Sequence, residues 1–245
     1  MHRFFVRPEA IGGDEVVLQK QAHQIRDVLR LKAGEHIVVL DDEGFEYETD
    51  LTAVSRGEVK GKIVEKREAS GEPDVQITLY QSMLAREKFE WVLQKCTEVG
   101  VTRFVPVIST RTLMRSCGIK ANKLARWRRI IQEAAEQSHR GKLPDLSPPT
   151  AFDKAIDDIE GSKRSLIASP EAGGENLRDC LKGYDGSRGV ALFVGPEGGF
   201  TKEEVQRCAE RGAVAFSLGK RILRTETAAV MASGLILYEL GELEG

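Results

Sequence analysis

The stretch FVGPEGGFTKEE, Phe193–Glu204, combines the end of an apolar run, a glycine-rich elbow and the start of a helix. An apolar run followed by such a turn and a helix is typical of a strand in a parallel sheet, because these strands are covered on both faces. The segment TKEE predicts a capping box between Thr201 and Glu204. We therefore expect an α/β fold in which the elbow connects a buried strand to a helix.

The elbow lacks the features of a phosphate-binding loop. It matches neither G-x-G-x-x-G nor G-K-[ST], Pro196 has no N–H to donate, and Glu197 places a negative charge where a phosphate would lie. A nucleoside that carries a positive charge fits better, because the glycines allow close approach of main chain and a carboxylate attracts a cation. A glycine-rich turn without a ligand is the alternative.

Strands and helices alternate on both sides of this elbow. Ligands of parallel sheets bind beyond the carboxyl ends of the strands. Three strand ends carry unusual loops, SPEAGG from Ser169, GPEGG from Gly195 and GKRILRTETA from Gly219, and we expect the site where these loops meet. Thr225 or Thr227 is expected to cap the last helix. Apolar strands are predicted at 75–83, 103–109, 165–169, 189–195 and 214–219, and helices at 86–100 and 122–141.

The first 70 residues have a different pattern, with strand-like alternation and one predicted helix within residues 19–35. Residues 67–74, REASGEPD, have the composition of a linker. The sequence thus predicts a small β-barrel domain at 1–70 and an α/β domain at 74–245.

Charge is unevenly distributed along a chain whose net charge is only −2. Residues 86–142 carry 13 Lys and Arg against five Asp and Glu, and residues 99–132 carry eight cations and no anion. A surface of one sign favours a polyanionic partner. A solvated helix face is the alternative, although such faces usually mix both signs.

The remaining composition points to the cytoplasm. The four cysteines have no metal-binding or disulfide-framework spacing, so we expect reduced thiols and no metal site. The apolar stretches are too short for a membrane span, and the first residues lack the apolar core of a signal peptide. We expect a cytoplasmic protein with no membrane partner.

Several motifs together resemble a known family. FVGPEGGFTKEE, LGKRILRTETA, KFEWVLQKCTEVGV and EAAEQSHRG resemble the SPOUT superfamily of trefoil-knotted RNA methyltransferases, and within it the enzymes that methylate N3 of a uridine in 16S ribosomal RNA. MHRFFV and HQIRDVLRLKAGE resemble the PUA-like barrel of these enzymes. The resemblance implies a knotted α/β domain with helices on both faces of a parallel sheet, a homodimer, and 16S ribosomal RNA, within the small ribosomal subunit, as the partner.

The resemblance also implies S-adenosylmethionine as the cofactor, bound by the three loops. Backbone of the elbow and of the third loop is expected to hold adenosine, the first loop to close the methionine side, and residues 224–227 to border the methyl group. The residues implied are Ser169, Pro170, Glu171, Val194, Gly195, Pro196, Glu197, Gly198, Gly199, Leu218, Gly219, Ile222, Leu223, Arg224, Thr225, Thr227 and Ala228.

Glu133, Gln137 and Arg140 share one face of the helix predicted at 122–141, by their spacing of four and three residues. That face could read the edge of uracil, with Arg140 stabilising the developing oxyanion. Glu226, Glu133 and His139 are each able to accept the N3 proton, and the sequence leaves this choice open. A surface helix without a ligand is the alternative reading of the face.

Basic residues of both domains are candidates for RNA contacts. Lys88 and Lys95 are equally well explained as helix-surface charges. The candidates are Arg3, Arg7, Arg26, Arg30, Lys88, Lys95, Arg111, Arg115, Arg126, Arg128 and Arg129.

Three other functions stay open at this point. The first is a methyltransferase of the same kind that acts on another RNA site, and the second is a relative that binds RNA without catalysis. The third is an enzyme that uses NAD or ATP on a Rossmann-like sheet.

Overall fold

The computed structural model describes residues 1–113, 119–159, 164–169 and 175–243. The chain divides into two compact units, of which the first comprises residues 1–72 and 132–143 and the second comprises residues 73–131 and 144–245. The division along the chain falls between Glu72 and Pro73. No feature of the sequence indicated that residues 132–143 group with the N-terminal part.

The first unit is built on a six-stranded sheet in the order β1-β4-β5-β6-β3-β2. Only the β1–β4 pair is parallel. Strand β4 is buried on both faces, because Ile37 and Val39 enter one apolar cluster while Val38 and Leu40 enter another. The second cluster includes Ala135 and Leu143, which explains why residues 132–143 belong to this unit. The strands are β1 (His2–Phe5), β2 (Ile11–Gly12), β3 (Glu15–Leu18), β4 (His36–Leu40), β5 (Phe45–Val54) and β6 (Val59–Glu68).

The helix predicted within residues 19–35 is much shorter in the structure. It is a single π-helical turn, η2 (Gln24–Val28), in which the N–H of Leu29 donates to the carbonyl of Gln24 at 2.9 Å. Arg30 follows with φ of 59°, a left-handed conformation that ends the helix before the predicted stop at Gly34. A 3₁₀ turn, η1 (Pro8–Ala10), precedes β2.

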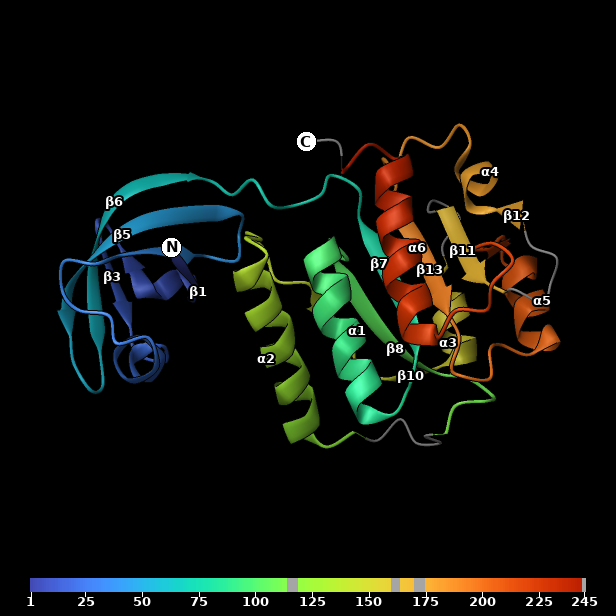
Figure 1. Cartoon of the computed structure of the whole chain (residues 1–245), viewed down its shortest axis with the longest axis horizontal. Coiled ribbons are helices and arrows are strands. Elements are labelled where there is room, and N and C mark those ends of the chain that lie inside the picture. The colour runs from blue at the N-terminus through green and yellow to red at the C-terminus, as the bar shows by residue number, and fades with distance from the viewer. Residues whose placement is uncertain (114–118, 160–163, 170–174, 244–245) are drawn as a thin grey trace. The chain divides into compact units, whose positions relative to one another are not determined.

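The second unit is built on an eight-stranded sheet, and its strands are parallel, as predicted. Its order is β10-β8-β7-β13-β11-β14-β12, with β9 also paired to β8 (Figure 1). The strands are β7 (Ile77–Ser82), β8 (Arg103–Ile108), β9 (Asp145–Leu146), β10 (Thr150–Ala151), β11 (Arg164–Ala168), β12 (Glu175–Asn176), β13 (Val190–Val194) and β14 (Val214–Ser217). The two-residue strands β9, β10 and β12 were not predicted.

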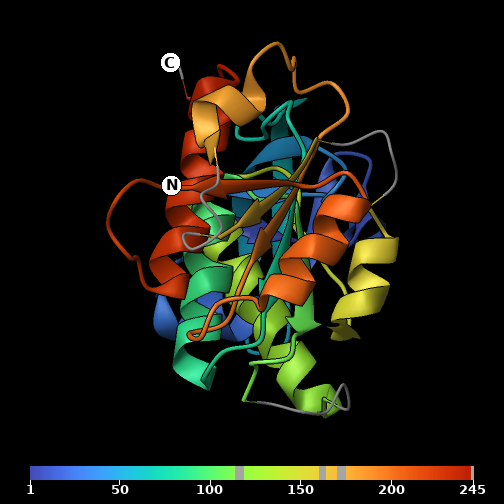
Figure 2. The ribbon, with the colours of Figure 1, turned by 90° about the vertical axis from the view of Figure 1, so that its right-hand side faces the viewer.

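Helices cover both faces of this sheet. Figure 2 shows α1 and α6 on one side and α3 and α5 on the other. The two apolar clusters follow this arrangement, because α1 and α6 contribute to the larger cluster and α3 and α5 to the smaller. The helices are α1 (Arg86–Val99), α2 (Ala121–Gln137), α3 (Phe152–Asp157), α4 (Leu177–Leu181), α5 (Lys202–Glu210) and α6 (Thr225–Glu239).

The order of strands brings the three predicted loops to one edge. β13 lies between β7 and β11, and β11 pairs with β14, all in parallel. Their carboxyl ends therefore lie side by side. The last residues of these strands, Ala168, Val194 and Ser217, are 23 to 49 residues apart in the sequence.

Two further expectations concern cysteines and the membrane. Cys96, Cys180 and Cys208 are free and buried, as expected for reduced thiols. Burial raises the pKa of the Cys208 thiol to about 12, so the thiol is protonated at neutral pH. Cys117 lies outside the described residues. In the described part of the chain, no helix is long and apolar enough to cross a membrane.

Candidate functional site

The glycine-rich elbow is a tight turn at the end of a fully buried strand. The N–H of Gly199 donates to the carbonyl of Pro196 at 2.9 Å, and Gly199 has φ of 67°. A Cβ atom on Gly195 would lie 3.0 Å from the backbone nitrogen of Phe200. Glycine is therefore favoured at 195 by the close approach of the turn's own backbone and at 199 by the backbone conformation.

The predicted capping box is confirmed at the start of α5. The N–H of Glu204 donates to Thr201 Oγ1 at 3.2 Å, and the N–H of Thr201 donates to Glu204 Oε2 at 2.8 Å. Glu204 is completely buried, and its Oε1 accepts the N–H of Thr110 at 2.7 Å. These carboxylate contacts occupy the first turn of the helix, which supports the prediction that the elbow is no phosphate loop.

A cavity of about 890 Å³ opens at the edge where the three loops meet. Its size is in the range of cavities that bind cofactors. Main chain and small side chains of the elbow form one wall, and the segment between β14 and α6 forms another. The lining residues from the predicted set are Ser169, Val194, Gly195, Pro196, Glu197, Gly198, Gly199, Leu218, Gly219, Ile222, Leu223, Arg224, Thr225, Glu226 and Ala228.

Some residues differ from that prediction. Thr227 is not among the lining residues, and Pro170 and Glu171 lie outside the described residues. Lys220 and Arg221 also line the cavity. Their place in GKRILRTETA was the signal that could have identified them.

The start of α6 also differs from expectation. The prediction that Thr225 or Thr227 caps this helix is wrong, because Arg224 is the N-cap residue and has no side-chain capping bond. The hydroxyl of Thr225 instead donates to the carbonyl of Gly195 at 2.5 Å. This bond joins the two walls of the cavity.

Charged groups at the cavity are partly paired with each other. Lys88 Nζ lies 3.0 Å from Glu197 Oε1, and Arg111 Nη1 donates to the carbonyl of Gly198 at 2.6 Å. Burial raises the pKa of Glu197, but hydrogen bonds from its own backbone and from Lys88 outweigh burial, and the net pKa is below the usual value. Glu197 is thus an anion at neutral pH. In the described residues, Oε2 of Glu226 is buried without a hydrogen-bond partner.

The helix face predicted to read the base is different in the structure. The prediction that Arg140 shares a face with Glu133 and Gln137 is wrong, because α2 ends at Gln137 and His139 has φ of 65°. The helix therefore ends four residues before Gly141, the residue at which it was expected to end. Glu133 and Gln137 are exposed, whereas Arg140 is only 2% exposed.

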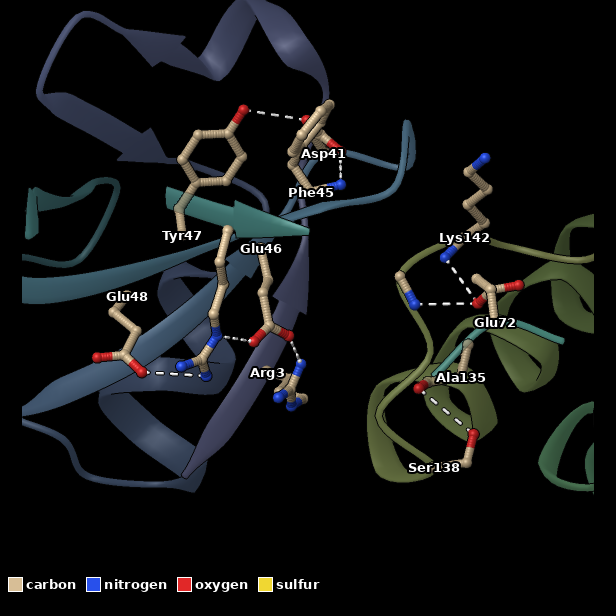
Figure 3. Close-up of polar contacts among 12 residues, drawn as sticks. Arg3, Asp41, Phe45, Glu46, Tyr47, Glu48, Glu72, Ala135, Ser138 and Lys142 are labelled. Atoms are coloured by element: carbon tan, nitrogen blue, oxygen red, sulfur yellow. Dashed lines mark hydrogen bonds and ion pairs between the residues drawn. The ribbon is translucent and has the colours of Figure 1, made fainter. Parts of the chain in front are cut away.

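Arg140 is held by a carboxylate of its own unit. Its Nη2 and Nε donate to Glu72 at 2.8 Å and 3.2 Å. The N–H groups of Gly141 and Lys142 each donate to Glu72 Oε1 at 3.0 Å, and Figure 3 shows the bond from Lys142 to Glu72. Glu72 therefore anchors the turn that follows α2.

The predicted RNA-binding residues fall into three groups. Several are engaged in ion pairs: Arg3 with Glu46, Arg26 with Asp27, Lys95 with Glu98 and Arg126 with Glu90, the first of which is drawn in Figure 3. Lys88 and Arg111 lie at the cavity. Exposed residues are Arg7, Arg30, Arg128 and Arg129, and Arg115 lies outside the described residues.

The second unit thus defines a class of protein: an α/β domain with a parallel sheet and a backbone-lined cavity at the strand ends, which suits a nucleoside-type ligand. Among the described residues, no group of three His, Cys, Asp or Glu side chains is arranged to hold a metal ion. Residues 71–237 match a family model described as an RNA methyltransferase domain, and residues 19–64 match one described as an RNA methyltransferase PUA domain. The chain belongs to this RNA methyltransferase family.

Relatives and solved structures agree along the whole chain. Ribosomal RNA small subunit methyltransferase E of Bacillus subtilis is 32% identical over 96% of this chain and 92% of its own. The protein of the same name from Synechocystis is 34% identical over 94% of this chain and 75% of its own. The Neisseria gonorrhoeae structure of a methyltransferase of that name, bound to S-adenosyl methionine, has a TM-score of 0.88, 33% identity and 97% coverage of both chains. A Legionella pneumophila methyltransferase in complex with the same cofactor has a TM-score of 0.86, 30% identity and 96% coverage of both chains.

These comparisons confirm the resemblance and the fold class that the motifs predicted. The first unit contains a PUA-like domain, and the second is an RNA methyltransferase domain. The alternative of an NAD- or ATP-dependent enzyme is therefore set aside. The trefoil knot stays a prediction.

Proposed function

We propose that this protein is an S-adenosylmethionine-dependent methyltransferase that modifies N3 of a uridine in 16S ribosomal RNA. The observation that carries the proposal is the backbone-lined cavity at the strand ends, in a chain that matches small-subunit methyltransferases over more than nine-tenths of its length. The fold alone would not define the reaction, because one fold hosts many activities.

The cavity has the chemistry that S-adenosylmethionine requires. The glycines of the elbow let a flat base and a ribose approach the main chain, and Leu218 and Leu223 offer apolar contact. Of the two carboxylates that line the cavity, Glu197 is paired with Lys88, and Glu226 is proposed to attract the positive charge of the cofactor. The bound cofactor supplies an electrophilic methyl group, and the protein supplies the placement of the two reacting atoms.

Glu226 is our candidate for the group that accepts the N3 proton. Among Glu226, Glu133 and His139, only Glu226 is one of the residues that line the cavity in the described structure. Its Oε2 has no hydrogen-bond partner among the described residues, so no other protein group occupies this acceptor. Deprotonation places a lone pair on N3, which can then attack the methyl carbon in line with the sulfonium.

Gln137 and Glu133 are proposed to contact the uracil edge, since both are exposed on α2. Arg140 is proposed to support the turn that follows α2 through its ion pair with Glu72.

The ribosomal RNA is proposed to contact exposed cations of both units. We propose four exposed members of the predicted set for these contacts, Arg128 and Arg129 of α2 and Arg7 and Arg30 of the first unit. Phosphate contacts of this kind make affinity strongly salt-dependent. We also propose that the protein acts in the cytoplasm on RNA within the small ribosomal subunit.

A homodimer is proposed on the basis of the exposed side of α6. Met231 and Tyr238 of α6 are 45% and 53% exposed, and Trp91 of the neighbouring helix α1 is 42% exposed. Met231 and Tyr238 are seven residues apart, so both lie on one face. A helix that is apolar on all sides is expected to be covered, and a second copy would cover this face. Met231→Glu with Tyr238→Glu should yield monomers in sedimentation, whereas Val64→Glu on the first unit should not.

Nucleoside mass spectrometry tests the proposed reaction. Small-subunit RNA from a strain that lacks this protein is incubated with the purified protein and S-adenosylmethionine that carries a labelled methyl group. We expect labelled 3-methyluridine in 16S RNA and none with the Glu226→Gln variant, which should still bind the cofactor. If the label appeared in another nucleoside or at another site, the proposed specificity for N3 of uridine would be wrong. Cofactor binding without any transfer would support the RNA-binding alternative.

A further inference from the structure

Gln81 is a buried amide directly beneath the cavity that does not line it. It lies near the carboxyl end of β7, is 1% exposed, and pairs in register with Val194 of β13, the last residue before the elbow. The residues that line the cavity come from β11, the elbow and the segment from β14 to α6, together with Lys88 and Arg111. The amide therefore has no place in the site described above.

The side chain of Gln81 joins three segments. Its Nε2 lies 3.1 Å from the carbonyl of Ser82, 3.4 Å from the carbonyl of Val194 and 3.2 Å from Thr225 Oγ1. Two backbone carbonyls around one amide nitrogen fix the orientation of the amide, because the opposite orientation would place three oxygens together. Oε1 of Gln81 is buried without a partner in the described part of the chain.

Thr225 continues this chain of hydrogen bonds to the elbow. Its hydroxyl accepts from Gln81 and donates its single hydrogen to the carbonyl of Gly195 at 2.5 Å. Thr225 is the first residue of α6 and is 8% exposed. The chain Gln81–Thr225–Gly195 thus connects β7, the start of α6 and the elbow inside the protein.

The two helices that begin at the cavity are fixed in different ways. The start of α5 is held locally by the Thr201–Glu204 capping box. The start of α6 has no side-chain cap at Arg224, so its side-chain tie to the elbow is the Thr225 bond. Without that bond, the two cavity walls could move apart, and a ligand would bind only the fraction of molecules in which they are correctly spaced.

We propose that Gln81 and Thr225 form a buried brace that sets the spacing of the two cavity walls, which makes Gln81 a positioning residue for methyl transfer. This inference rests on the proposed function. The brace acts on cofactor affinity through the shape of the empty cavity, and Gln81 itself contacts neither the cofactor nor the base.

Calorimetric titration with S-adenosylmethionine tests the brace. Gln81→Met keeps the length of the side chain but removes both amide groups, and Thr225→Val keeps the shape but removes the hydroxyl. Each should weaken binding roughly tenfold, the usual effect of losing a buried hydrogen bond. Gln81→Met should affect KM for the cofactor much more than kcat at saturating cofactor. Thr225→Ser should restore binding to within about threefold of the unchanged protein.

The double variant separates a brace from two independent effects. If one brace carries both losses, Gln81→Met should cost less than about twofold in the Thr225→Val background. Ser233→Ala is the matched control, because Ser233 is a fully buried α6 hydroxyl that donates to Ala229 within the helix, and its loss should leave cofactor affinity unchanged.

Three results would overturn the inference while leaving the proposed function intact. They are unchanged binding by Gln81→Met, losses that multiply fully in the double variant, and equal affinities of Thr225→Val and Thr225→Ser. The Thr225 comparison decides the matter if Gln81→Met does not fold. Failure of the unchanged protein to bind S-adenosylmethionine would instead remove the proposed function.

Discussion

Glu204 accepts the N–H of Thr110 at 2.7 Å with one carboxylate oxygen and the N–H of Thr201 at 2.8 Å with the other. One completely buried side chain therefore fastens the start of α5 to the loop after β8. Arg111, the next residue of that loop, lies at the mouth of the cavity. Glu204 thus also fixes the loop that carries Arg111, a lining residue of the cavity.

Glu204→Gln should lower the free energy of unfolding by about 1–3 kcal/mol, because an amide can accept only one of the two N–H groups and presents its own donor to the other. Urea unfolding measures this loss. Glu203→Gln, at the exposed neighbouring position, should change stability by less than about 0.5 kcal/mol. Equal effects of the two variants would show that the Thr110 contact contributes nothing to stability.

Arg140→Ala and Glu72→Gln should each destabilise the protein by about 2–3 kcal/mol, because either change breaks a largely buried ion pair whose carboxylate is 20% exposed. At a temperature where both variants are folded, we expect similar residual methyl transfer. Thermal unfolding and initial rates are measured together. A loss of activity confined to Arg140→Ala would indicate that the guanidinium contacts the base.

Gly195→Ala should weaken cofactor binding by at least roughly tenfold, because its Cβ would lie 3.0 Å from the nitrogen of Phe200 and distort the elbow. Gly212→Ala is the control. Gly212 has φ of 87° with no atom near its added Cβ, so that change should cost stability but leave affinity unchanged. Calorimetry with S-adenosylmethionine distinguishes the two, and normal binding by Gly195→Ala would refute the role given to the turn.

Glu46 should make the first unit sensitive to acid. Burial raises the pKa of Glu46, but hydrogen bonds from Arg3 and Arg67 outweigh burial and lower the net pKa below its usual 4.5. A lowered folded-state pKa contributes stability that is present above about pH 4.5 and is lost as the pH falls through the folded value.

Circular dichroism at several pH values checks this expectation. Glu46→Gln should be less stable at pH 7 and should lose less stability than the unchanged protein on acidification below pH 4.5. If both proteins lost the same stability as the pH fell below 4.5, the acid sensitivity would arise from other carboxylates.

Arg128→Ala should weaken binding to 16S RNA and reduce the slope of log affinity against log salt by about 0.7, the value for one phosphate contact on single-stranded nucleic acid. Fluorescence anisotropy at several salt concentrations measures the slope. Arg178→Ala is the matched control, because this exposed arginine of α4 pairs with Glu239 outside the basic region. An unchanged slope for Arg128→Ala would remove that residue from the RNA contacts.

Local patterns predicted much of the fold and the cavity. The capping box at Thr201, the strands of the parallel sheet and most cavity residues follow from periodicity, turn chemistry and the family resemblance. These features depend on neighbouring residues, so the sequence displays them directly.

Features that depend on distant partners were missed or misassigned. Helical spacing placed Arg140 beside Gln137, but the chain turns at His139 and Glu72 takes the guanidinium. The longer helix predicted within residues 19–35 is only a π-helical turn, Gln24–Val28, because Arg30 takes a left-handed conformation that its residue type did not indicate.

The sequence by itself determined that an apolar strand meets a glycine elbow and a capped helix, because strand burial, turn conformation and capping are properties of a few adjacent residues. The tertiary structure alone decided that Gln81 and Thr225, 144 residues apart, meet beneath the elbow. Such a contact arises only when the sheet places β7 next to β13 and α6 begins beside them, and no local pattern encodes that distance.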